Sequence, residues 1–183
     1  MTNHVHLLLS SNDRDGVGAL MKALGQRYVQ YVNRHYRRSG TLWEGRYRSS
    51  LTQEENYFLV CQRYIELNPI RAAMVAHPAE YRWSSYRVNA QGEPGELVTP
   101  HALYMELGAD EPARQCAYRE LFRYELDPGL VDEIRKATNG NFALGDTRFG
   151  EQITQALGRR AQAGKVGRPL KKSRAAPETG KLF

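Results

Sequence analysis

The stretch His4-Val5-His6-Leu7-Leu8-Leu9 decides the expected fold. A short apolar run of this length predicts a β-strand over residues 4–10. Because side chains alternate between the two faces of a strand, His4 and His6 are expected on one face and Val5 on the other. Two neighbouring imidazoles suit a divalent metal ion, although such a pair in a strand is more often structural.

The composition indicates a globular protein with one core and appendages. The chain has 183 residues, of which 41% are hydrophobic and 10% aromatic. No apolar run approaches the roughly 18 residues of a membrane span, and no signal-peptide pattern is seen. Cys61 and Cys116 lie far apart, outside any metal-binding spacing. They are expected to be reduced thiols, which favours a cytoplasmic location.

The charge of the chain is unevenly distributed, with a net value of +6. Lys and Arg number 12 against 7 Asp and Glu in residues 1–87, 6 against 12 in residues 88–158, and 8 against 1 in residues 159–183. Basic ends around an acidic middle suggest two contacts with a polyanion. The alternative is an ordinary solvated charge pattern.

Three helices are expected in the first half. Apolar spacing predicts one from about Val17 to Arg38, rich in arginine and tyrosine. Residues 42–51 fit either a strand or an extended loop. Thr52 and Glu55 form a capping-box pattern, which predicts a helix from there to about Leu67, ended by Pro69. A short helix over residues 70–75 is expected to follow.

A linker at residues 91–95 precedes a stretch with helical signals only. Four helices are expected, over residues 99–108, 110–124, 127–139 and 146–157. The stretch 159–183 has too few apolar residues to fold alone, so we predict a basic disordered tail. The expected domains are therefore residues 1–90, a helical extension over residues 96–158, and the tail.

A nucleophile and a third metal ligand are available on the second helix. Tyr64 and Asn68 are four residues apart and share one helical face. A tyrosine hydroxyl can attack a phosphodiester, and a metal held by His4, His6 and the Asn68 amide oxygen would stabilise the developing charge. Tyr64 also fits an ordinary core aromatic, and Asn68 a simple helix-end residue.

Three segments resemble one family of enzymes. The residues in question are Met1–Leu9, Gly40-Thr41-Leu42-Trp43-Glu44-Gly45-Arg46-Tyr47, and Arg63–Ala72 together with Trp83-Ser84-Ser85-Tyr86. In this order they resemble the small single-tyrosine HUH transposases of insertion sequences, and in particular the REP-associated tyrosine transposases. The resemblance covers about residues 1–87.

The resemblance implies an activity and a site. The histidines matching His4 and His6 bind Mg²⁺ or Mn²⁺, Asn68 completes the metal site, and Tyr64 is the nucleophile. The implied reaction cleaves and rejoins hairpin-bearing single-stranded DNA through a 5′-phosphotyrosine intermediate, inside a bacterial cell near the nucleoid. The rival hypothesis is a catalytically inactive DNA-binding remnant of such a transposase.

The resemblance also implies an α+β, ferredoxin-like fold that lacks its N-terminal strand and helix and is followed by a helical C-terminal extension. Members of the family normally have several dozen residues before the histidine segment, so either an internal methionine was taken as the start or the gene is truncated. A histidine strand without a sheet neighbour leaves backbone groups uncovered. We therefore expect low stability and weak or absent activity of this chain.

Basic residues interleaved with aromatics predict the DNA contacts. The expected DNA-binding residues are Arg27, Arg34, Arg37, Arg38, Trp43, Arg46, Arg48, Lys165, Arg168, Lys171 and Lys172. Residues 167–169, Gly-Arg-Pro, resemble the core of an AT-hook, although we favour a generic basic tail. Residues 99–158 suit a helix-turn-helix, a homodimer contact or packing on the first module.

Overall fold

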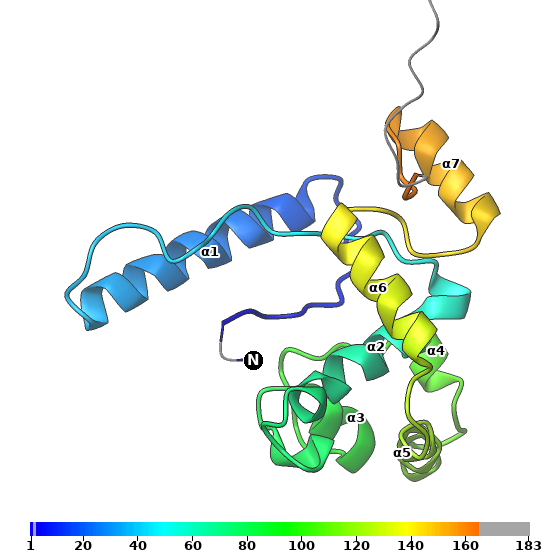
Figure 1. Cartoon of the computed structure of the whole chain (residues 1–183). Helices are drawn as coiled ribbons and strands as arrows, with labels where there is room; N and C mark the ends of the chain where they lie inside the picture. The colour runs from blue at the N-terminus through cyan, green and yellow to red at the C-terminus, as the bar shows by residue number, and fades with distance from the viewer. Residues whose placement is uncertain (2, 165–183) are drawn as a thin grey trace, which may run out of the picture.

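The computed structural model describes residues 1 and 3–164 (Figure 1). It contains seven α-helices and one short 3₁₀ helix in this part of the chain. Their bounds are α1 Gly16–His35, α2 Glu54–Arg71, η1 Pro78–Glu80, α3 Tyr86–Gln91, α4 Ala102–Met105, α5 Glu111–Glu120, α6 Pro128–Gly140 and α7 Thr147–Leu157. Lys165, Arg168, Lys171 and Lys172 lie outside the described residues.

The expected α+β, ferredoxin-like core is wrong. Residues 1 and 3–164 form no sheet, and their only β-type pairing is an isolated parallel bridge between Thr52 and Leu144. Residues 4–10 are irregular because no second strand lies beside them to pair with their backbone N–H and C=O groups. The alternation of faces is partly retained, since His6 and Leu8 are half-buried while Val5, Leu7 and Leu9 are exposed.

Helix α2 is longer than the sequence predicted. It begins after Gln53 instead of Thr52, and no side chain caps its first turn. It also continues through Pro69 to Arg71, although proline removes the hydrogen bond that its own N–H would make within the helix. Buried Pro69 is therefore accommodated inside the last turn, and no separate helix forms over residues 70–75.

The later helices begin where capping residues predicted. Asp110, Asp127 and Asp146 each accept a hydrogen bond from a backbone N–H in the first turn, at 2.8, 3.0 and 2.7 Å. Asn141 and Gly158 follow α6 and α7 with left-handed backbone conformations, which end both helices. The helical character of residues 102–157 is thus confirmed.

Two hydrophobic cores lie against α2. The first joins Cys61 and Tyr64 of α2 to Val131, Ile134 and other residues of and around α6. The second joins helices α3, α4 and α5, with Leu59 of α2 packed against it. Helix α2 therefore contributes to both cores, and Figure 1 shows α6 crossing it.

A buried polar network ties α2 to the second core. The Glu66 side chain is fully buried. Its carboxylate accepts hydrogen bonds from Ser85 at 2.6 Å, from Asn89 at 3.2 Å and from Tyr118 at 2.8 Å. Because burial penalises the charged form, the pKa of Glu66 is raised to about 7.

Helix α1 contributes no buried residue. Figure 1 shows it extending away from the other helices, with the following segment running back along it. Trp43 of that segment lies 5.8 Å from the Tyr28 ring and donates to the Gly25 carbonyl at 3.3 Å. Arg48 then donates to the Asn139 side chain in α6, and Ser50 donates to the Phe142 carbonyl just after that helix.

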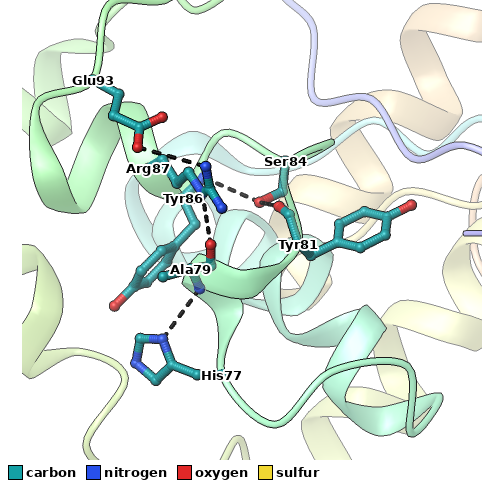
Figure 2. Close-up of polar contacts among 7 residues, drawn as sticks. All are labelled: His77, Ala79, Tyr81, Ser84, Tyr86, Arg87 and Glu93. Atoms are coloured by element: carbon teal, nitrogen blue, oxygen red, sulfur yellow. Dashed lines mark hydrogen bonds and ion pairs between the residues drawn. The ribbon is translucent and has the colours of Figure 1, made fainter.

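The loop between α2 and α3 is held by its own polar contacts (Figure 2). Arg87 donates to the Ala79 carbonyl at 2.6 Å, and His77 accepts from the Ala79 N–H at 3.2 Å. The Tyr81 side chain points away from these contacts in Figure 2, and its hydroxyl accepts from the Met1 amine. The loop therefore fixes the chain end near α2.

Candidate active site

The structure brings the two histidines and Tyr64 together. The His4 and His6 rings lie 4.9 Å apart between centroids, nearly perpendicular to each other. The His6 ring lies 5.8 Å from the Tyr64 ring, also edge to face. The irregular segment at residues 3–10 and helix α2 thus meet at His6, a contact that sequence spacing alone does not reveal.

Packing fixes the position of Tyr64. Its side chain lies on the face of α2 that faces the first core, and the residue is 8% exposed. Helix α6 supplies Val131 and Ile134 to the same cluster. A side chain held on several sides has few alternative rotamers, so its hydroxyl keeps one position relative to His6.

The environment of His6 favours its neutral form. Burial, and to a smaller extent electrostatic repulsion from His4, the Met1 amine and Arg71, together lower the pKa of His6 to about 4. At neutral pH the imidazole is therefore uncharged. Metal ions bind the neutral imidazole, so His6 needs no proton removed before it can act as a ligand.

The Asn68 side chain is buried and has a polar atom without a hydrogen-bond partner. It is 8% exposed, and its side-chain nitrogen is buried without a hydrogen-bond partner. The oxygen and nitrogen of an amide are assigned from such partners, so either atom can occupy this position. Among the described residues no hydrogen bond joins Asn68 to His4 or His6, and its role as a ligand stays a prediction.

The predicted donors, His4, His6 and Asn68, would suit a metal bound in an open site. Within residues 1 and 3–164 no three His, Cys, Asp or Glu side chains gather in a way that would hold a metal ion. Two imidazoles and an amide leave the remaining positions to water or to oxygens of a substrate. Such mixed ligation suits Mg²⁺ or Mn²⁺ held together with a phosphate.

Arg71 is part of this site, and the sequence analysis missed it. Its guanidinium carbon lies 4.6 Å from the centroid of the Tyr64 ring, and the side chain donates to the Tyr64 backbone carbonyl. The available signal was its spacing, because residues seven apart lie two turns along the same helical face. A basic residue in a last helical turn is more commonly seen as a cap.

The predicted DNA-binding residues lie on two surfaces. Arg27 and Arg34 line a shallow hollow on α1 together with Gln30, Tyr31 and His35. The other predicted residues lie near the loop that follows α1: Arg37 and Arg38 just after the helix, and Trp43, Arg46 and Arg48 along the returning segment. Arg38 donates to Thr41 at 3.3 Å and Arg48 to Asn139 at 2.7 Å, so these two side chains have partners inside the protein.

Comparison with known families identifies the N-terminal segment. Residues 1–68 match the family model described as IS200-like transposase, and the match includes the histidine segment and Tyr64. Residues 1–68 therefore belong to the IS200-like transposase family, as the resemblance predicted. The match supports a DNA-processing function of the transposase kind. No curated protein and no solved structure matches it.

No helix within residues 1 and 3–164 is both long enough and apolar enough to cross a bilayer.

Proposed function

We propose that the protein cleaves and rejoins hairpin-bearing single-stranded DNA, with Tyr64 as the nucleophile. The observation that carries the proposal is the contact of the His6 ring with the Tyr64 ring, at 5.8 Å between centroids. The two histidine rings thus lie beside a hydroxyl-bearing side chain, within a segment that matches the transposase family. Nucleophile and metal ligands need this proximity to act on one phosphate.

The reaction balances without an external energy source. The Tyr64 oxygen forms a bond to phosphorus while the bond from phosphorus to the 3′ oxygen of the preceding nucleotide breaks. The phenol loses its proton and the leaving 3′ oxygen gains one, giving a 5′-phosphotyrosine and a free 3′-hydroxyl. The reverse reaction joins a 3′-hydroxyl to the same phosphate and releases Tyr64.

The residues of the chain would have separate roles in this reaction. His4, His6 and Asn68 would hold Mg²⁺ or Mn²⁺, which supplies Lewis-acid stabilisation of the phosphate charge. Helix α2 and the first core hold Tyr64 in place. The mixture of nitrogen and oxygen donors favours exchange of the metal and does not favour a permanent structural ion.

Helix α1 has the features of a single-strand binding surface. The Tyr31 and His35 rings are nearly parallel, at 12° and 5.8 Å, and Tyr31 is 63% exposed. Arg27 and Arg34 flank them in the same hollow. Exposed rings stack on unpaired bases while neighbouring arginines bind the phosphates, so this combination fits a single strand. A homodimer stays a prediction.

The test is formation of a covalent adduct. Hairpin-bearing single strands labelled at either end are incubated with the protein and Mn²⁺ and run on a denaturing gel. We expect only the 3′-labelled strand to become attached, because a 5′-phosphotyrosine links Tyr64 to the downstream fragment. Tyr64→Phe is expected to abolish the adduct. Tyr57→Phe, two turns earlier on α2, is the matched control and retains it.

One observation favours the rival function, a DNA-binding remnant. Tyr64 is 8% exposed and forms part of a hydrophobic core, which is also what an inert aromatic residue would do. Salt-dependent binding of the same strand, with no adduct in Mg²⁺ or in Mn²⁺, would favour the remnant over the enzyme.

A further inference from the structure

Arg71 occupies an unusual place at the end of α2. Its guanidinium lies over the Tyr64 ring at 4.6 Å and also donates to the Tyr64 backbone carbonyl. Pro69, two residues earlier, lacks the N–H that would bond to the Ile65 carbonyl. This turn of the helix therefore lacks one backbone hydrogen bond. The Arg71 side chain folds back along this turn and is held against the ring of the proposed nucleophile.

The charges around Arg71 are positive. None of the ion pairs within residues 1 and 3–164 includes Arg71. Its pKa is lowered, first by burial and then by the positive charge of Arg135 on α6, while Tyr64 acts in the opposite direction. Arg71 in turn lowers the pKa of His6. The Arg71 guanidinium therefore has cationic neighbours and no carboxylate partner within the described residues.

A capping role explains only part of this geometry. An arginine in a last turn interacts favourably with the final carbonyls of a helix, and Arg71 does contact one. Capping accounts for neither the stacking on Tyr64 nor the absence of a carboxylate partner in the described part of the chain. A guanidinium has five N–H donors in a planar fork, so most of them remain for a second acceptor.

We propose that Arg71 binds the phosphate group that Tyr64 attacks. The proposal rests on the proposed function, which supplies the phosphate, and adds a residue that contacts the substrate. The guanidinium carbon lies 4.6 Å from the centroid of the phenol ring, on the side chain that would carry the phosphate ester. Charge-assisted N–H···O bonds to phosphate are strong and often bidentate, which would both orient the phosphate and stabilise the charge.

The first test measures adduct formation at several DNA concentrations, with Arg71→Ala, Arg71→Lys and the control Arg82→Ala. Arg82 stacks on Trp83 at 4.4 Å and so forms the same type of pair at another place. We expect Arg71→Ala to lower the maximal rate by about 10²- to 10³-fold, the effect typical of losing one donor to a developing charge. Arg71→Lys should recover part of it, and Arg82→Ala should stay near wild type.

Chemical rescue separates binding from a structural role. Added guanidinium ion should restore part of the rate of Arg71→Ala and none of the rate of Tyr64→Phe. A wild-type rate in Arg71→Ala would overturn the proposal. A loss that guanidinium does not restore, together with a lowered melting temperature in both Arg71 variants, would also overturn it in favour of capping.

A second measurement does not depend on cleavage. Inorganic phosphate should raise the melting temperature of the wild type and of Tyr64→Phe more than chloride does at equal ionic strength. Arg71→Ala should lose this difference and Arg82→Ala should keep it. If the wild type forms no adduct but shows the Arg71-dependent shift, the proposed function fails and the anion site stands. If phosphate has no specific effect on the wild type, the Arg71 proposal fails.

Discussion

His6 lies between His4 and Tyr64, so its charge determines whether a cation can bind there. Its pKa of about 4 keeps the ring neutral at pH 7. We predict that His6→Ala weakens Mn²⁺ binding at least about tenfold, the size of effect usual for groups that support a metal site. Titration of Mn²⁺ followed by electron paramagnetic resonance of the free ion measures this. His35→Ala, on exposed α1, is the control, and equal affinities in all three proteins would exclude His6 as a ligand.

The residues of the site were predictable to different degrees. Helical spacing placed Tyr64 and Asn68 on one face, because an interval of four residues fixes that relation locally. The meeting of His6 with Tyr64 depends on long-range packing, and only the family resemblance pointed to it. Arg71 was missed because a capping arginine and a ligand-binding arginine look the same in sequence.

At the scale of elements, the turn after α2 positions Arg71. Ala73 has a φ of 51°, in the left-handed region that favours glycine. Its N–H bonds to Ile70 at 2.8 Å and that of Met74 to Pro69 at 2.9 Å, a Schellman arrangement. Alanine costs roughly 1–2 kcal/mol in this conformation. We predict that Ala73→Gly stabilises the protein by about 0.5–1 kcal/mol in urea unfolding, after the entropic cost of glycine is subtracted.

Ala72→Gly is the matched control, because Ala72 has a φ of −89° and gains nothing from glycine. This variant should be neutral or destabilised. If Ala73→Gly were instead destabilised to the same extent as Ala72→Gly, the turn after Arg71 would not have the left-handed conformation described here.

Local signals predicted the helices well and the sheet badly. Asp110, Asp127 and Asp146 cap helices where expected, since an N-cap depends only on the next three residues. A strand depends on a neighbour, and residues 4–10 have none among the described residues. Pro69 led to a different error, because the sequence predicted that it ends α2 and the helix continues to Arg71. Packing of the last turn of α2 outweighs the hydrogen bond that proline removes.

At the scale of the whole molecule, Glu66 connects α2 to α3 and α5 through Asn89 and Tyr118. Its pKa is raised from 4.5 to about 7, so the folded protein retains a proton that the unfolded chain releases. The stability this supplies is fully present below pH 4.5 and is lost as the pH rises through about 7. We predict a loss on the order of 3 kcal/mol from this group across that window, absent in Glu66→Gln.

His6 contributes to the pH dependence of the stability with the opposite sign. The pKa of His6 is lowered from 6.5 to about 4, so its stabilising effect is present above pH 6.5 and is lost as the pH falls through 4. Between pH 4.5 and 6.5 the two groups therefore oppose each other, and the wild type should show little net slope. In urea unfolding with a chelator present, Glu66→Gln should become more stable as the pH rises through this range, and His6→Ala less stable. Parallel pH profiles for the two variants would mean that neither group titrates as the packing around it requires.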